Sequence, residues 1–159
     1  MTHPDRLVPD EFAVPTGLDG DGFRLAPLGP EHNAADLAAW TSSIDHIRHT
    51  PGFAGRSWPA PMSPAENLAD LERHARDFAE RTGFTYTVLG PDGDVIGCVY
   101  LYPPRRAGFD VDVRSWVRAS HAQLDAPLYQ AVSAWLAEAW PFRRPDYAVR
   151  PGADPPPAR

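Results

Sequence analysis

Apolar and polar residues follow two different periods in the second half of the chain. Residues 95–102 form one apolar and aromatic run, and residues 110–117 alternate between apolar and polar side chains. Both patterns predict strands, because successive side chains of a strand point to opposite faces. From Asp125 to about Trp140 the apolar residues recur every three to four positions, which predicts an amphipathic helix. We expect the strands and helix of residues 94–142 to organise the rest of the chain.

The first half of the chain predicts a short strand followed by two helices. Residues 23–28 (FRLAPL) are typical of a strand, and Pro30 is well placed in the first turn of a helix. The apolar positions of that first helix lie three and four residues apart: Leu37, Trp40, Ile44 and Ile47. Residues 63–66 (SPAE) form a capping box that begins a second helix, which Gly83 is expected to end.

The remaining elements complete an alternating order of strands and helices. Residues 84–89 (FTYTVL) predict a strand that pairs with residues 95–102 through a Gly-Pro-Asp-Gly turn, and residues 146–150 predict a last strand. The order β-α-α-β-β-β-α-β predicts an α+β domain. Its mixed sheet has about five strands, with helices on both faces.

Domain boundaries follow from composition. Residues 1–22 are rich in Pro, Asp and Gly and predict an arm extended over the domain, while residues 23–150 hold the predicted elements. Residues 151–159 (PGADPPPAR) predict a disordered tail, because so few apolar residues cannot offset the entropy of ordering.

Composition excludes several classes of protein. The net charge is −6, which argues against a nucleic-acid partner because phosphate binding needs a basic face. All 15 basic residues are Arg, so Schiff-base catalysis and a Walker A lysine are excluded. No apolar run is long enough to span a membrane, and the first residues do not form a secretion signal. We therefore expect a soluble, cytoplasmic protein.

This order of elements, with its strand motifs, resembles the GNAT family of acyl-CoA-dependent N-acetyltransferases. Residues 95–100 (VIGCVY), after an Asp-Gly turn, are similar to the third strand of the family. Residues 111–117 (VDVRSWV) are similar to its fourth strand, close to an acid-x-x-x-Trp-aliphatic pattern. The resemblance covers residues 23–150 and implies transfer of an acetyl group from acetyl-CoA to an amine of a small molecule or peptide, directly within a ternary complex.

The resemblance also implies where acetyl-CoA would bind. In the family the fourth strand hydrogen-bonds the pantetheine arm, and amides of the following loop and helix bind the pyrophosphate, which needs N–H groups aimed at the phosphates. Carried over to this sequence, the cofactor-binding residues are Trp116, Val117, Arg118, Gln123, Leu124 and Ala126.

The corresponding loop departs from the Gln/Arg-x-x-Gly-x-Gly/Ala pattern of the family, because residues 118–127 contain no glycine. Asp125 stands where its carboxylate would compete with a phosphate for the helix amides, and Pro127 has no amide to offer. Arg118 and His121 would supply replacement positive charge. Either the loop backbone still binds a diphosphate, or side chains such as Asp125 fill that position and only the architecture remains.

The family continues past its fifth strand with another helix and two strands that help to form the acceptor site. This sequence ends shortly after Arg150. We therefore expect an acceptor site that is open, or that is completed by the N-terminal arm or by a second subunit in a homodimer.

Candidate site residues follow from the two central strands. Asp112 is the candidate general base, since burial would raise the pKa of its carboxyl; the alternative is that it belongs to a polar strand face with Asp110 and Arg114. The resemblance implies a tyrosine that protonates the leaving thiolate, and Tyr100 is the candidate for it, with ordinary packing as the alternative. Candidate substrate-binding residues are Trp58, Tyr102 and Arg114. We expect Trp58→Ala to alter ligand binding with little change in melting temperature.

Other reactive residues have structural interpretations. Cys98 lies within an apolar strand, which favours a core position over a nucleophile. His46 and His49 lack a third ligand of suitable spacing, so we predict no metal site. Arg105 and Arg106 would either meet a CoA phosphate or an acidic partner, or form an exposed pair. The competing hypothesis for the whole chain is a GNAT-like binding module that has lost acetyl-CoA binding.

Overall fold

The computed structural model describes residues 6–159 and arranges them around one mixed sheet of six strands. The strands lie side by side in chain order: β1 (Leu18–Gly20), β2 (Phe23–Pro27), β3 (Phe84–Leu89), β4 (Val95–Tyr102), β5 (Val111–Val117) and β6 (Pro145–Tyr147). Neighbours are antiparallel except β5 and β6, which are parallel. The predicted α+β class and mixed sheet are confirmed, with one strand more than expected.

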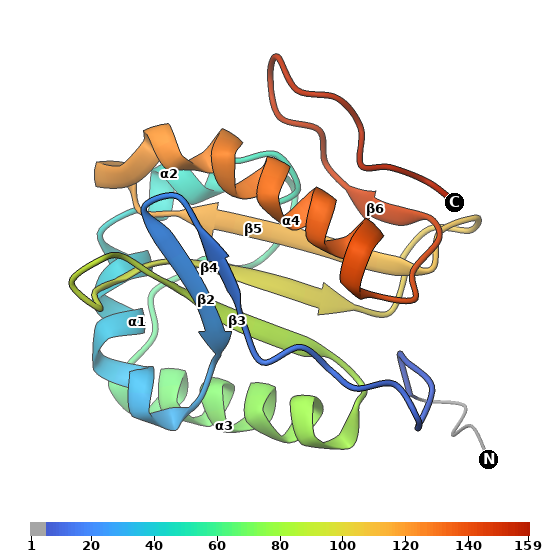
Figure 1. Cartoon of the computed structure of the whole chain (residues 1–159). Coiled ribbons are helices and arrows are strands. Elements are labelled where there is room, and N and C mark those ends of the chain that lie inside the picture. Colours follow the sequence, from blue (N-terminus) through green and yellow to red (C-terminus); the bar gives the residue numbers. More distant parts are fainter. Residues whose placement is uncertain (1–5) are drawn as a thin grey trace.

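The α-helices of the described residues are α1 (Asn33–Thr41), α2 (Ile44–Arg48), α3 (Pro64–Glu80) and α4 (Asp125–Ala139). Short 3-10 turns, Pro30–His32 and Ala119–Leu124, precede α1 and α4. Figure 1 shows α4 lying across one face of the sheet, with α1 and α3 on the other. Helices therefore cover both faces, as the element order predicts.

Side chains of β4 alternate between two separate cores. Val99 and Leu101 point into the cluster under α4, whereas Cys98 and Tyr100 point into the cluster under α1 and α3. The strand packs closely against β5, because a Cβ on Gly97 would meet the Trp116 carbonyl oxygen at 2.4 Å. A side chain at this position would push the two central strands apart.

The first predicted helix is divided in two. α1 ends at Thr41 and α2 begins at Ile44, so Trp40 and Ile47 are buried on different helices. Ser42 and Ser43 occupy the break; the Ser42 hydroxyl donates to the Ala39 carbonyl, and serine hydroxyls compete with helical hydrogen bonds in this way. The break frees the Ser43 hydroxyl to accept the Ala119 amide at 2.8 Å.

α3 begins as predicted, and its left-handed cap lies two residues earlier than expected. The Ser63 hydroxyl accepts from the Glu66 amide at 3.1 Å, and the Glu66 carboxylate accepts from the Ser63 amide at 2.9 Å. Arg81, with φ of 66°, takes the left-handed conformation that we expected Gly83 to provide. Its guanidinium donates to the carbonyls of Pro9 and Phe12, which ties the N-terminal segment to the end of the helix.

Both ends of the described chain contact the domain. Val8 is only 2% exposed within the core under α4, and β1 extends the sheet, so the segment predicted as an arm contributes to the packing. In the predicted tail, Arg159 donates to the Trp140 carbonyl at 2.7 Å, and the Asp154 carbonyl accepts from Tyr129 at 2.7 Å. Residues of the predicted tail therefore hydrogen-bond to the domain. Residues 1–5 of the predicted arm lie outside the described residues.

β6 is shorter than predicted, which determines the shape of the sheet edge. Tyr147 is the last residue that pairs with β5, opposite Val113. Beyond it the backbone leaves β5, and the Arg150 side chain, instead of a strand, reaches the Ser115 carbonyl at 2.7 Å. Residues 114–117 of β5 therefore have no paired strand on the β6 side among the described residues.

Candidate functional site

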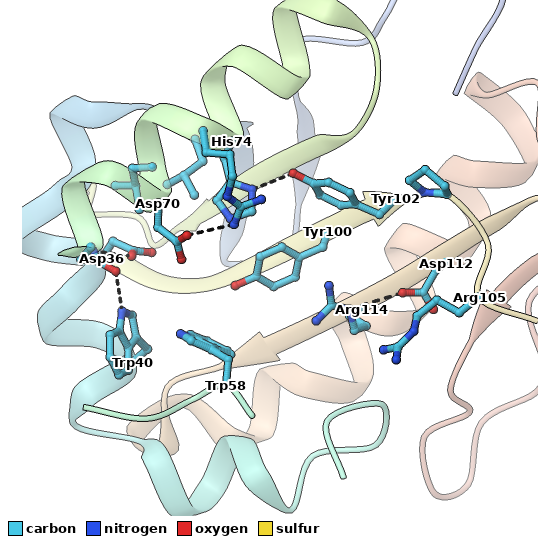
Figure 2. Close-up of a pocket in the computed structure, with 15 residues that line it drawn as sticks. Asp36, Trp40, Trp58, Asp70, His74, Tyr100, Tyr102, Arg105, Asp112 and Arg114 are labelled. Carbon is cyan, nitrogen blue, oxygen red and sulfur yellow. Dashed lines mark hydrogen bonds and ion pairs between the residues drawn. The ribbon is translucent and has the colours of Figure 1, made fainter. Parts of the chain in front are cut away.

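A cavity of about 370 Å³ lies between the two central strands and the helices of one face. Its walls come from α1, α3, β4, β5 and the loop that precedes α3 (Figure 2). Aromatic side chains form much of the lining: Trp40, Trp58, Tyr100 and Tyr102. Ionisable side chains project among them: Asp36, Asp70, Arg73, His74, Arg105, Asp112 and Arg114. Apolar walls with a few polar groups are typical of small-molecule sites.

Trp58 comes from the Pro-rich loop before α3, and it lines the cavity as part of an aromatic group. Its ring centroid lies 5.4 Å from that of Trp40, 6.1 Å from Trp116 and 6.0 Å from Phe53. The residue is half-buried against the core under α1 and α3. Trp58 therefore lines the cavity, and a contact with substrate stays a prediction, but its packing predicts a stability cost that the sequence did not suggest.

Asp112 is 6% exposed and lines the cavity from β5. One of its carboxylate oxygens lies 3.4 Å from Nε of Arg114 and 3.8 Å from a terminal nitrogen of Arg56. Burial raises the pKa of the Asp112 carboxyl, while Arg114 and Arg56 oppose that rise. Asp112 is thus ion-paired with arginines and also lines the cavity. Both interpretations from the sequence therefore stay open: a general base, or a residue of a polar strand face.

The two tyrosines of β4 have different surroundings. The Tyr100 hydroxyl accepts from the Trp116 indole at 3.0 Å, and burial raises the pKa of Tyr100 well above its ordinary value. The Tyr102 hydroxyl donates to Asp77 at 2.7 Å, and burial raises its pKa as well. Both side chains line the cavity as protonated phenols.

His74 of α3 was missed in the sequence and lines the cavity beside these tyrosines. Its Nδ1 lies 2.8 Å from the Tyr102 hydroxyl and 2.9 Å from the Thr85 hydroxyl. Burial, assisted by Arg73, lowers the pKa of His74 to about 4, so the imidazole is neutral at neutral pH. The available signal was its position: His74 lies three residues after the buried Leu71 on the inward face of α3.

Asp36 of α1 is a second residue that the sequence analysis missed. The side chain is 4% exposed, and burial raises the pKa of its carboxyl to about 6. Its carboxylate accepts from the amide of Asn67 at 3.2 Å, and the Asn67 oxygen accepts from the Trp40 indole at 3.1 Å. An acid four residues before Trp40 on a predicted buried face was the available signal.

Two further residues with reactive side chains, Cys98 and Tyr147, lie within the two cores and outside the cavity lining. Cys98 is fully buried, and burial raises the pKa of its thiol, which agrees with a core residue. Tyr147 is 3% exposed and lies 2.5 Å from the Ser115 hydroxyl. In residues 6–159 no group of three His, Cys, Asp or Glu side chains is placed to hold a metal ion.

The segment predicted to bind CoA lies between β5 and α4, and four of its backbone amides already have hydrogen-bond partners. Those of Arg118, Ala119, His121 and Asp125 donate to Ile96, Ser43, Arg118 and Ala122. Side chains of Trp116 and Val117 are fully buried, Leu124 packs on the core, Ala126 is half-buried and Gln123 is exposed. The predicted cofactor-binding residues are therefore neighbours along the chain, and the amide of one of them, Arg118, is already bonded to Ile96.

Arg150 fills the place beside β5 where β6 has diverged. It is 1% exposed, and its guanidinium donates to Asp125 at 2.8 Å and to the Ser115 carbonyl at 2.7 Å. Further bonds reach the carbonyls of Pro51 and Ala148. Asp125 is the first residue of α4, so its carboxylate lies at the helix N-terminus, where it is paired with the Arg150 guanidinium. As arranged here, these residues do not fit a pantetheine arm along β5 or a diphosphate at α4.

Comparisons with known proteins identify the fold. No protein-family model matches the sequence, and no curated protein matches it. Among solved structures, the ribosomal-protein-S5-alanine acetyltransferase of Vibrio fischeri is 14% identical with a TM-score of 0.64, over 88% of this chain and 77% of that one. RimJ of Mycobacterium smegmatis, in complex with CoA-disulfide, is 14% identical with a TM-score of 0.63, over 86% and 67%.

A third neighbour is the Salmonella typhimurium acetyltransferase that modifies the N-terminal serine of ribosomal protein L7/L12. It is 12% identical with a TM-score of 0.64, over 82% of this chain and 73% of that one. These neighbours are GNAT-family acetyltransferases, and the likeness shows that the chain has the GNAT fold. At such identities the fold alone is shown, because one fold serves many functions.

Proposed function

We propose that the chain binds an amine-bearing small molecule or peptide end in the cavity, and that N-acetyl transfer to this amine is the reaction the site serves. The observation that carries the proposal is an aromatic cavity in which Asp112 and the neutral His74 line the wall. Support for an acyl reaction comes from the fold, since the solved neighbours are acetyltransferases of ribosomal proteins. A peptide N-terminus is therefore one acceptor to be tested.

The residues of the cavity are suited to an amine nucleophile. An amine attacks only in its neutral form, and the guanidiniums beside Asp112 would lower the pKa of an amine bound there. Asp112 would then accept the proton that the amine loses on attack, as a general base. His74 is neutral at neutral pH, and its Nδ1 lies 2.8 Å from the Tyr102 hydroxyl. We assign it to orienting the acceptor together with Tyr102.

The proposed transfer needs an acyl donor. Acetyl-CoA would supply the acetyl group, as the neighbour bound to CoA-disulfide suggests. However, Arg150 and Asp125 occupy the space beside β5 and α4. Transfer from CoA therefore requires these two side chains to separate, and we derive no donor contacts from the closed arrangement.

That closed arrangement favours a second candidate function, a GNAT-fold module that binds its ligand in the cavity and transfers nothing. Both candidate functions place a ligand in the cavity. They differ only in whether acetyl-CoA binds and donates its acetyl group. Calorimetry with acetyl-CoA, and mass spectrometry of amines and N-terminal peptides incubated with it, separate them. For the transferase we expect an acetylated product, with a loss of about 10²–10⁴-fold in rate for Asp112→Asn.

Each outcome of this experiment decides between the candidates. Absence of product and of binding at millimolar acetyl-CoA, with an amine still bound in the cavity, would refute the transferase and leave the binding module. If neither acetyl-CoA nor any amine binds, both candidates are wrong.

Other expectations from the sequence remain predictions. In residues 6–159 the helices are too short and too polar to cross a membrane. A cytoplasmic location, the lack of a nucleic-acid partner and a homodimer are tested by fractionation, by binding to nucleic acid and by light scattering.

A further inference from the structure

A second hollow adjoins the cavity, since Arg105, Asp112 and Arg114 line both. Arg56, from the loop before α3, lines the second hollow but not the cavity. Figure 2 shows Arg105, Asp112 and Arg114 together at one end of the cavity, away from Asp36 and Trp40. The cavity therefore has an arginine-rich end and an aromatic end.

Positive charge exceeds negative charge at the arginine-rich end. Asp112 is shared between Arg56 at 3.8 Å and Arg114 at 3.4 Å, both longer than a close ion pair. Within the described part of the chain, Arg105 has no ion-pair partner. The other acid of the second hollow, Asp146, is already bound by both nitrogens of Arg106 at 2.7 and 2.9 Å. Apart from the Arg106–Asp146 pair, three guanidiniums and one carboxylate thus line the arginine-rich end.

Two further observations agree with unbalanced positive charge. Nε of Arg114 is buried and donates no hydrogen bond to the described residues, while its guanidinium lies 5.0 Å from the Tyr100 ring centroid. Burial and the neighbouring Arg114 lower the pKa of Arg56. The chain as a whole has a net charge of −6, so the positive charge of these arginines is a local feature of this end of the cavity.

We propose that Arg56, Arg105 and Arg114 form an anion subsite, so that the ligand of the cavity carries a carboxylate or a phosphate besides its amine. Arginine suits both groups because its planar guanidinium donates paired hydrogen bonds. The proposal rests on the cavity as the ligand site and is independent of acetyl-CoA. It narrows the acceptor to amino acids, acidic peptides, amino phosphates and similar zwitterions.

Inorganic phosphate tests the subsite without knowledge of the ligand. We expect millimolar phosphate, at constant ionic strength, to shift the guanidinium NMR signals of Arg56, Arg105 and Arg114 in a saturable manner. Arg105→Gln should weaken that binding about tenfold. Arg143→Gln removes the same charge from an exposed position outside both hollows and should leave it unchanged. No saturable shift, or equal shifts at Arg143 and Arg144, would overturn the proposal.

A matched set of small-molecule probes tests whether the site prefers a ligand that carries both an amine and an anionic group. Benzylamine, para-(aminomethyl)benzoate and para-(aminomethyl)phenylphosphonate share one body and differ in the anion. We expect an acidic probe to bind about tenfold more tightly than benzylamine, and Arg56→Gln to abolish the difference; the two acids show which anion is preferred. Equal affinity of all three would refute the anion subsite and leave the amine cavity intact. Phosphate binding without binding of any amine would instead refute the proposed function.

Discussion

Removal of Arg150 is the most informative single change, because the residue both supports the fold and fills the place expected for CoA. Its guanidinium is the partner of the Ser115 carbonyl and of the Asp125 carboxylate, and it also bonds to the Pro51 carbonyl. Arg150→Met keeps the apolar part of the side chain and deletes all of these bonds.

The expected stability loss follows from the groups that lose their partner. The Ser115 carbonyl would lie buried without a donor, which costs about 1–3 kcal/mol. Breaking a fully buried ion pair costs roughly 3–5 kcal/mol, but the Asp125 side chain is 20% exposed and water can replace its partner. We therefore expect a loss of about 2–3 kcal/mol in unfolding free energy, or roughly 5–10 °C in melting temperature.

The same variant should make room beside β5. If the closed pair excludes acetyl-CoA, Arg150→Met should raise its affinity by about tenfold or more, since the cofactor no longer competes with an ion pair. Urea unfolding followed by tryptophan fluorescence gives the stability, and calorimetry gives the affinity. Arg143→Gln serves as the charge control, since Arg143 is exposed. If Arg150→Met is as stable as the wild type, the hydrogen bonds of Arg150 do not stabilise the fold. If it binds acetyl-CoA no more tightly than the wild type, the Arg150–Asp125 pair does not exclude the cofactor.

Three further predictions concern the cavity. Burial raises the pKa of Asp36 to about 6 from 3.8, so its ionisation destabilises the folded state increasingly from pH 4 to 6; Asp36→Asn should gain about 2–3 kcal/mol near pH 8 and nothing near pH 4, measured by urea unfolding at both. His74, with a pKa lowered to about 4, should show no NMR titration between about pH 6 and 8, and its protonation should destabilise the fold as pH falls from about 6.5 to 4; a midpoint near 6.5 would contradict its burial. Trp58→Ala should weaken ligand binding and, given its aromatic contacts, also lower stability by about 2 kcal/mol, in place of the unchanged melting temperature predicted from the sequence; an unaltered denaturation curve would show that those contacts contribute little.

The order of helices and strands could be predicted from the local sequence, because each helix or strand depends on interactions between residues close together in the chain. The capping box at Ser63 is satisfied within one turn, and alternation along β4 assigns its side chains to two faces wherever the strand lies. The break between α1 and α2 was not predicted, because the apolar spacing continues across it from Trp40 to Ile47. What ends the helix is a pair of serines, one of which bonds to Ala119 far along the chain.

The sites depended on contacts between distant residues, which no local pattern reports. The lack of glycine in residues 118–127 and the position of Asp125 were visible in the sequence, and they left two alternatives: a backbone that still binds a diphosphate, or side chains such as Asp125 in its place. That Arg150 binds Asp125 and the Ser115 carbonyl was decided by the tertiary structure, because β6 leaves β5 after Tyr147. His74 and Asp36 likewise became site residues only when α3 and α1 packed on the same face of the sheet, since burial there sets their pKa values.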